Sequence, residues 1–394
     1  MKRLTQLDGL RGLAALVVVV WHLSLIAQPF LDTNSTGDAW WWMSETPLRL
    51  ATDGTEAVLL FFVLSGLVVA LPAVQKGFSW KKYFASRFVR LYIPAWGALA
   101  LAAILIFCVP RVSSNVTANY WLSSDNAKSI QPLTLLQDGT LLKVGNTADN
   151  VLWSLRWEII FSLLLPVFVL AAVLIRRSWI AFALAMAGCV ALTVGDPQHA
   201  DGAFYLPVFM MGTLMASRLE SIQNWAARRS RAFWVATLST SLFFMVADQI
   251  FSFAVPAGTV GGGLLWSLVG AGAAGVILCA IGFEPLRGFL AARANQFLGR
   301  ISFSLYLIHV PIIATLAYVL GDAQWWLVGI IGLPLSIGAA AVFHRFVEIP
   351  SQRLAHHIGA RVAGTRRATA SGDRESAPMS VEEAPQPGFA RAIR

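Results

Sequence analysis

Long runs of apolar residues, separated by short polar segments, dominate this sequence. An α-helix needs roughly 17 to 25 mainly apolar residues to cross the hydrocarbon core of a bilayer. Runs of about this length predict ten membrane-spanning helices, over residues 10–29, 56–75, 91–110, 157–175, 178–195, 203–217, 232–250, 262–283, 301–320 and 325–346. Because the run at 203–217 is short, nine crossings are the alternative. The pattern therefore predicts an all-α, polytopic membrane bundle.

The distribution of basic residues predicts how this bundle is oriented. If the N-terminus is cytoplasmic and ten spans alternate, 24 of the 30 lysine and arginine residues fall in cytoplasmic segments and five in outward segments. Cytoplasmic loops of membrane proteins carry such an excess of positive charge. We therefore expect both termini to lie in the cytoplasm.

The composition supports lipid as the solvent of this chain. Only 13% of the residues are charged, whereas soluble domains carry about 25%. The net charge of +9 comes from residues spread between apolar runs, so membrane orientation explains it and no nucleic-acid partner is expected. The cysteines lack the spacing of a disulfide framework or a metal site, and we predict neither: Cys108, Cys189 and Cys279. The first apolar run contains Asp8 and Arg11 near its start, so no cleavable signal peptide is expected.

Polar segments outside the apolar runs divide the chain into a membrane domain and a tail. The outward loops 30–55 and 111–156 are long, and the second is expected to form a cap or an entrance. Residues 359–394 are polar and rich in Ala, Pro, Arg and Glu, a composition that cannot bury a core. We therefore predict a membrane domain over 1–358 and a disordered cytoplasmic tail over 359–394.

Two ionisable residues in the first apolar run are candidates for chemistry, because charges inside a span usually face a cavity or a partner. Arg11 and His22 are eleven residues apart, so on a helix they share one face about 16 Å apart. Gly9 and Gly12 allow a neighbouring helix to approach closely. The alternative is an interfacial arginine and a core histidine that only satisfies a neighbour.

The segment WSLRWE at the start of the fourth run carries an acid into the membrane. Trp153 and Ser154 precede Glu158 there, and the predicted topology puts Glu158 in the same outer half as His22. The carboxylate could then orient that imidazole. The alternative is an interfacial acid paired with Arg156.

Three further positions have both a chemical and a structural interpretation. Arg87 and Arg90 lie on one helical face at i, i+3, which suits bidentate binding of a phosphate; ordinary positive-inside anchoring is the alternative. Ser65 and His309 lie within predicted spans. Each could take part in catalysis or could only serve helix packing.

Six segments together resemble the membrane acyltransferase 3 family, which acylates sugars of cell envelopes and some secreted small molecules. They occur in the family's order over nearly the whole chain except the tail: LDGLRGLAALVVVVWH, GTEAVLLFFVLSG, SRFVRLYIP, WSLRWE, LGRISFSLYLIHVP and FVEIPSQR. The resemblance implies that His22 is catalytic, within an arginine–ten–histidine signature that begins at Arg11. It also implies that Arg87 and Arg90, in the RxxR motif, bind the phosphates of an acyl-CoA donor from the cytoplasm.

Two other motifs of that family have matching residues, and one position departs from it. The matches are WSLxxE at Trp153, Ser154 and Glu158, and Glu-x-Pro at Glu348 and Pro350. Many relatives have a second acid and an aromatic residue after the glutamate, whereas this chain has Ile159 and Ser162. The resemblance therefore leaves the acceptor open.

The resemblance implies an O-acyltransferase in a bacterial plasma membrane. It would move an acyl group, with acetyl the first candidate, from cytoplasmic acyl-CoA to a hydroxyl of O-antigen, exopolysaccharide or another glycoconjugate, without a bound cofactor or metal. In our hypothesis His22, oriented by Glu158, is a general base or accepts the acyl group itself. Two other functions remain possible at this stage: a transporter of a sugar or small solute that uses the buried Arg, His and Glu as a relay, and a structural assembly factor for polysaccharide export.

Overall fold

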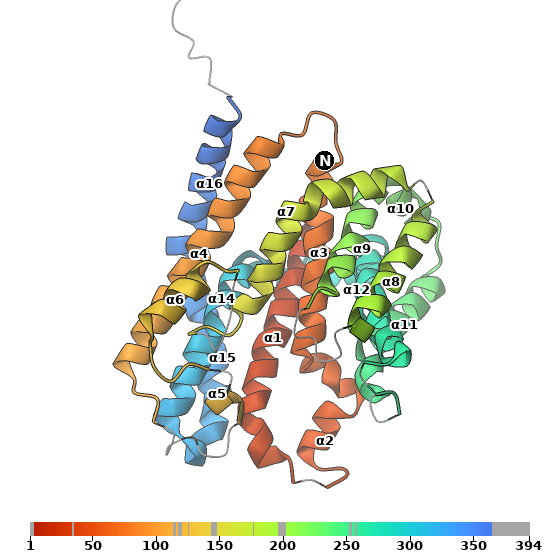
Figure 1. The fold of residues 1–394 in the computed structure, drawn as a ribbon. Helices are drawn as coiled ribbons and strands as arrows, with labels where there is room; N and C mark the ends of the chain where they lie inside the picture. The colour runs from red at the N-terminus through yellow and green to blue at the C-terminus, as the bar shows by residue number, and fades with distance from the viewer. Residues whose placement is uncertain are drawn as a thin grey trace, which may run out of the picture.

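The computed structural model describes residues 4–33, 35–112, 116, 120–124, 126–142, 148–175, 177–195, 202–251, 254–256 and 258–364. These residues form a bundle of apolar helices (Figure 1). Its long members are α1 (Thr5–Leu31), α3 (Gly54–Ala73), α4 (Trp80–Cys108), α7 (Leu152–Leu174), α8 (Ser178–Gly195), α9 (Tyr205–Ser217), α11 (Arg231–Ile250), α12 (Val260–Gly282), α14 (Arg293–Leu320) and α15 (Trp325–Phe343). Each predicted span has its helix, and the described part of the chain contains no strand. The all-α polytopic class is confirmed.

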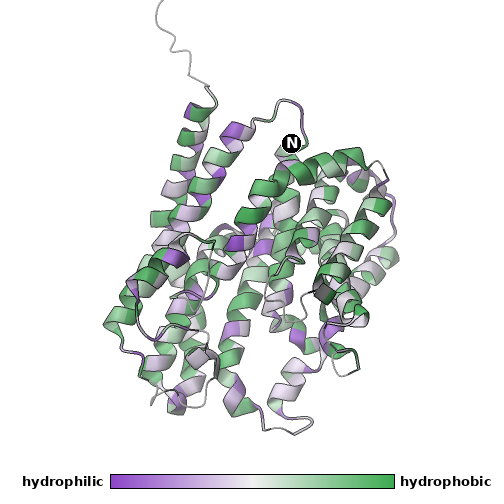
Figure 2. Cartoon of the chain, in the orientation of Figure 1, coloured by the Kyte–Doolittle hydropathy of each residue, from purple (hydrophilic) through white to green (hydrophobic). Residues whose placement is uncertain are grey.

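Most of these helices are long enough to cross a bilayer. Eight have the length and the apolar composition of a membrane span, and the helices at 180–194 and 205–217 are shorter. Figure 2 shows apolar residues over most of the helices, with hydrophilic residues at helix ends, in loops and in a patch inside the bundle. The chain is therefore a multi-pass membrane protein, whereas ten crossings and two cytoplasmic termini stay predictions.

The centre of the bundle is formed by α1, α3 and α14. Fourteen of the 20 residues of α3 are buried, as expected for a helix that is apolar on most sides. Helix α1 packs along α14, and α3 packs along α9. A Cβ at Gly9 or Gly12 of α1 would overlap backbone atoms of Leu290 or Gly299. The predicted close approach at these two glycines is confirmed.

The last span continues beyond its predicted end. Helix α15 runs through a π-helical turn (His344–Glu348) into α16 (Ile349–Val362), which packs against α4. Helix α16 thus extends past the predicted domain boundary at 358. The predicted disorder of the tail falls mostly on residues 365–394, which lie outside the described residues.

Short helices form parts of the two long outward loops. The first loop contains α2 (Ala39–Ser44) and a 3₁₀ turn, η1 (Pro47–Ala51), and the second contains α5 (Tyr120–Ser124) and α6 (Pro132–Gly139). Figure 1 places α2 and α5 at the end of the bundle opposite the first turn of α1. Two other short helices follow long ones: α10 (Leu219–Ala226) follows α9, and α13 (Glu284–Leu290) follows α12. Helix α13 packs against α1.

Helix α5 is fixed to the bundle by polar contacts. Tyr318 of α14 donates a hydrogen bond to the carbonyl of Leu122, at 3.3 Å. Arg111 donates to the carbonyl of Ala127, at 2.8 Å, and its guanidinium lies over the Tyr318 ring. The loop is therefore docked on α14, in keeping with the expected cap.

Candidate active site

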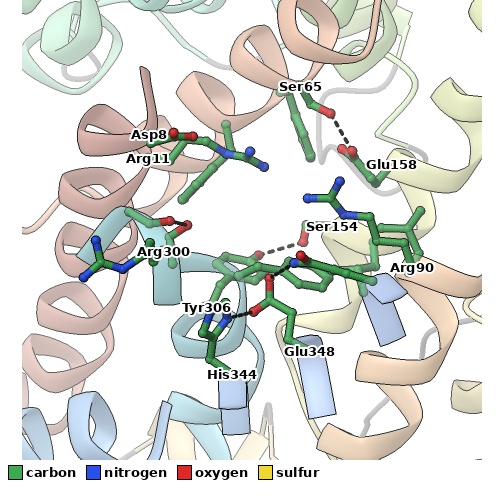
Figure 3. Close-up of a pocket in the computed structure, with 18 of the residues that line it drawn as sticks. Asp8, Arg11, Ser65, Arg90, Ser154, Glu158, Arg300, Tyr306, His344 and Glu348 are labelled. Carbon is green, nitrogen blue, oxygen red and sulfur yellow. Dashed lines mark hydrogen bonds and ion pairs between the residues drawn. The ribbon is translucent and has the colours of Figure 1, made fainter. Parts of the chain in front are cut away.

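A cavity of about 330 Å³ lies between α1, α3, α4, α7, α14 and the π-helical turn (Figure 3). Its polar lining includes ionisable and hydroxyl side chains from several helices. These residues are Asp8, Arg11, Ser65, Arg87, Arg90, Ser154, Glu158, Arg300, Tyr306, His344 and Glu348. We call this space the inner cavity, because it lies near the first turns of α1.

Arg87 and Glu158 form a largely buried ion pair in the wall of the inner cavity. Ser65 of α3 donates a hydrogen bond to the same carboxylate oxygen of Glu158. Arg87 also donates from Nε to the hydroxyl of Ser162, at 3.1 Å. The pair joins α3, α4 and α7, and it satisfies charges that would be costly to leave alone in the membrane.

This ion pair gives Arg87 and Glu158 partners that their motifs do not indicate, while the expected phosphate-binding role of Arg87 stays a prediction. Arg87 was expected to grip a phosphate together with Arg90, but its guanidinium is engaged by Glu158. Helix α4 begins at Trp80, where the hydroxyl of Ser79 caps it, so Arg87 lies two turns inside the helix rather than in a cytoplasmic loop. The burial of Arg87 explains why it takes a carboxylate as its partner.

The structure does not show the expected contact between Glu158 and His22, and the orienting role of this acid stays a prediction. Among the described residues, the carboxylate of Glu158 contacts Ser65 and Arg87 and no imidazole. Glu158 lines the same cavity as Arg11, and eleven residues of helix separate Arg11 from His22, or about 16 Å. The acid thus shares a cavity with Arg11, whereas His22 is not part of the lining of that cavity.

Two arginines of the inner cavity remain without a carboxylate partner. Within the described part of the chain, neither Arg11 nor Arg90 forms an ion pair, and the buried Nε of Arg11 has no hydrogen-bond acceptor. Figure 3 shows their guanidinium groups pointing towards each other across the cavity. Asp8 and Glu348 line the same cavity, but the two guanidinium groups keep hydrogen-bond donors with which they can bind an anion.

The π-helical turn adds a second polar group to the cavity wall. Glu348 accepts hydrogen bonds from His344 Nδ1 and Gln352 Nε2, both at 2.9 Å, and from the hydroxyl of Ser304. Such turns in helices often occur at functional sites. The sequence analysis named Glu348 only through the resemblance and missed His344. The i, i+4 spacing of these two residues was the available signal.

His22 and His309 contact each other outside the lining of the inner cavity, next to Tyr306. His309 Nε2 lies 3.1 Å from His22 Nδ1, which is itself 2.8 Å from the carbonyl oxygen of Val18. The two ring centroids are 4.9 Å apart. His309 is fully buried and His22 is half-buried. The arginine–ten–histidine signature therefore has a partner on α14.

Tyr306 connects the histidine pair to the inner cavity. It lines the cavity, its hydroxyl lies 2.7 Å from that of Ser154, and its ring centroid is 6.1 Å from that of His309. His22 itself is not in the described cavity lining. Trp153, the first residue of WSLxxE, packs at 5.5 Å from the Tyr205 ring instead of entering the cavity. Ser154 therefore lines the cavity and Trp153 does not, and their supporting roles stay predictions.

A second cavity, of about 440 Å³, lies between α5 and α6. We call it the outer cavity, and it is lined mainly by hydroxyl, amide and charged side chains: Ser123, Ser124, Asn126, Lys128, Ser129, Gln131, Thr134 and Asp138. Trp121, on the same short helix as Ser123, has its ring centroid 5.3 Å from that of His22. The histidine pair thus lies between Tyr306 of the inner cavity and the helix that borders the outer one.

The loop before α7 contains a buried carboxyl group, that of Asp149, whose pKa is shifted. Asp149 is fully buried, and its burial raises the pKa of the carboxyl well above the usual range, with Asp138 adding to the effect. A raised pKa favours the neutral form of a carboxyl, which can donate a hydrogen bond. Among the described residues no cluster of three or more His, Cys, Asp or Glu could hold a metal ion.

The comparison with known proteins agrees with the motifs. Residues 4–345 match the family model described as an acyltransferase domain. The acyltransferase MdmB of Streptomyces mycarofaciens is 26% identical over 390 residues, which cover 89% of this chain and 92% of the relative. The O-acetyltransferase PaAT-1 of Phomopsis amygdali is 24% identical over 380 residues, which cover 82% of this chain and 75% of the relative. No solved structure matches the chain.

These matches decide between the functions that the sequence left open. The family model covers most of the chain, and both relatives are named for acyl transfer. Transport without covalent chemistry and a purely structural role are not supported by either. The chain therefore belongs to the membrane acyltransferase 3 family and is a multi-pass membrane O-acyltransferase.

Proposed function

We propose that this protein transfers an acyl group, with acetyl the first candidate, from cytoplasmic acyl-CoA to a hydroxyl of an extracytoplasmic carbohydrate or glycoconjugate. The membrane would be a bacterial plasma membrane, and the acceptor O-antigen, exopolysaccharide or a related glycoconjugate. The observation that carries the proposal is the pair of unpartnered guanidinium groups, Arg11 and Arg90, facing the inner cavity.

The inner cavity has the chemistry expected of a donor site. Acyl-CoA is a thioester on a carrier with several phosphates, and guanidinium groups bind phosphate with strong, charge-assisted hydrogen bonds. Arg300 adds a third cation at the cavity lining. The length of α1 between Arg11 and His22, about 16 Å, is then bridged by the flexible arm of the carrier, with Tyr306 along its path.

The outer cavity supports a hydroxyl-rich acceptor. Its hydroxyl, amide and charged side chains can donate to and accept from the hydroxyl groups of a sugar. Its volume is within the range of small-molecule sites, roughly 300 to 1,000 Å³. Because α5 borders this cavity and also contacts His22 through Trp121, an acceptor held there has a short route to the imidazole.

His22 would carry the reaction in one of two ways. As a general base, its imidazole removes the proton of the acceptor hydroxyl, the oxygen attacks the thioester carbonyl, and the departing CoA thiolate takes that proton. As a nucleophile, the imidazole accepts the acyl group and passes it to the hydroxyl in a second step. A burst of free CoA before acceptor is added would distinguish the covalent route.

The donor site is tested by the kinetics of Arg90→Gln. The protein is reconstituted in nanodiscs, and transfer of label from radiolabelled acetyl-CoA to an envelope glycan fraction is measured. Loss of one charge-assisted contact, about 1.5 to 3 kcal/mol, predicts a KM for acetyl-CoA that rises about 10- to 100-fold, with KM for the acceptor unchanged.

Two controls complete this experiment. Arg156→Gln, which removes a cation stacked on Trp157 outside the inner cavity, should leave KM for acetyl-CoA near the wild-type value. Thr134→Val, in the outer cavity, should change KM for the acceptor instead. A KM for acetyl-CoA that does not respond to Arg90→Gln would contradict the donor site.

A further inference from the structure

The contact between His22 and His309 determines where the hydrogen atoms of both rings lie. His309 Nδ1 is 2.9 Å from the carbonyl oxygen of Leu305, and His22 Nδ1 is 2.8 Å from that of Val18. A carbonyl oxygen can only accept a hydrogen bond. Both Nδ1 atoms must therefore carry a hydrogen.

The second nitrogen of His309 then has only one possible role. In a neutral imidazole one nitrogen is a donor and the other an acceptor. His309 Nε2, at 3.1 Å from His22 Nδ1, is thus a second acceptor for the His22 Nδ1–H, which it shares with the carbonyl oxygen of Val18. A protonated His309 would point its Nε2–H at this hydrogen, so the geometry favours the neutral ring.

We propose that His309 is a positioning residue that, together with the carbonyl of Val18, holds His22 in the tautomer with a hydrogen on Nδ1 and a free lone pair on Nε2. This proposal rests on the proposed role of His22 in acyl transfer. It replaces the expected orienting acid, because Glu158 is engaged by Arg87 and Ser65. A neutral ring takes the place that a carboxylate occupies in a hydrolase triad.

The arrangement also serves His22 after it takes a proton. When the acceptor hydroxyl gives its proton to Nε2, His22 becomes an imidazolium whose Nδ1–H still donates to His309 Nε2. The proton then passes from Nε2 to the departing CoA thiolate, which returns His22 to its starting tautomer. His309 gains and loses no proton in this cycle. Its position therefore requires only a side chain that is long enough to place a hydrogen-bond acceptor near His22 Nδ1.

Two amide substitutions separate this role from ordinary packing. The amide oxygen of glutamine in His309→Gln reaches the position of the lost Nε2 and can accept from His22 Nδ1, whereas the side chain of His309→Asn is one methylene too short. Both are polar and smaller than histidine, and because Asn leaves the larger packing defect on α14, kcat is compared per amount of folded protein. We expect His309→Gln to keep kcat within about tenfold of wild type and His309→Asn to lower it by about 100-fold or more, with KM for acetyl-CoA unchanged in both.

The experiment uses the full chain in nanodiscs, with thermal stability measured for each variant. Equal loss of kcat in both amide variants, or no loss in His309→Asn, would overturn the positioning role. A rise in KM for acetyl-CoA would also overturn it, because that result indicates a donor contact. If His22→Ala remains fully active, it is the proposed function of His22 that fails, whatever His309 does.

A direct measurement covers the case in which His309→Asn does not fold. Nitrogen-15 spectra of histidine-labelled protein, with the His22 signals assigned by loss in His22→Ala, report which ring nitrogen carries the hydrogen. The wild type should show Nδ1–H and a bare Nε2 for His22, and His309→Gln should preserve both signals. A hydrogen on His22 Nε2 in the neutral wild type would overturn the proposal.

Discussion

At the residue scale, the polar side chains of the interior make contacts between helices that are far apart in the sequence. Arg11, Arg87, Arg90 and Glu158 all line one cavity, as their motifs led us to expect. Their pairing depends on depth in the bundle, which spacing within single helices does not determine. The ion pair of Arg87 with Glu158 and the contact of His22 with His309 each join helices far apart in the sequence.

The ion pair of Arg87 and Glu158 predicts a strong coupling in stability. Glu158→Gln leaves the guanidinium of Arg87 buried without its counter-charge, which should lower the free energy of unfolding by about 3 kcal/mol. Arg87→Gln with Glu158→Gln should recover part of this loss, because no charge then remains buried. Thermal denaturation in detergent measures the double-mutant cycle.

The control for this cycle is Arg156→Gln combined with Glu158→Gln. Arg156 lies on the same helix, but its guanidinium stacks on Trp157 and makes no ion pair with Glu158 in the described structure. The effects of these two changes should add. Additive effects for Arg87 and Glu158 as well would mean that the pair contributes nothing to the fold.

At the scale of helices, the apolar runs predict the elements and their order well. Gly9 and Gly12 also identified α1 as a closely packed helix, and α14 is its neighbour. The π-helical turn at His344–Glu348 and the short α5 were not predicted. Neither element has an apolar periodicity of its own in the sequence. Each is accompanied instead by a tertiary contact, that of Glu348 with Ser304 and that of Tyr318 with Leu122.

The contact of α1 with α14 makes Gly12 sensitive to a single methyl group. In Gly12→Ala the new Cβ would overlap the backbone of Gly299 and Leu298, so the helices must separate. We expect a loss of about 1 to 3 kcal/mol in stability, measured by thermal denaturation. Gly338→Ala on α15 has nothing within 4 Å of its new Cβ and should be neutral or slightly stabilising; an equal loss there would contradict the packing argument.

At the scale of the whole molecule, hydropathy predicts the bundle and charge predicts its orientation. What neither predicts is the arrangement of an inner cavity, a histidine pair and an outer cavity along α14, which carries Tyr306, His309 and Tyr318. The arrangement arises because the single helix α14 carries residues that contact the inner cavity, the histidine pair and the loop of α5. The family's motifs indicate these residues but not the path between them.

The orientation is tested by labelling single cysteines in intact cells. In a background without Cys108, Cys189 and Cys279, Ser35→Cys lies in the outward loop and Lys76→Cys in the loop between α3 and α4; both positions are exposed. A maleimide that cannot cross membranes should label Ser35→Cys in intact cells and Lys76→Cys only after lysis. The reverse pattern would place the inner cavity outside the cell and remove the route for cytoplasmic acyl-CoA.

The central claim is that acyl transfer passes through the imidazole of His22. It is tested most directly by following label from radiolabelled acetyl-CoA into the acceptor, with wild type and His22→Ala in nanodiscs at matched amounts of folded protein. We expect wild-type protein to transfer the label and His22→Ala to lose at least 100-fold in rate, with unchanged thermal stability. Full transfer by His22→Ala would contradict the account.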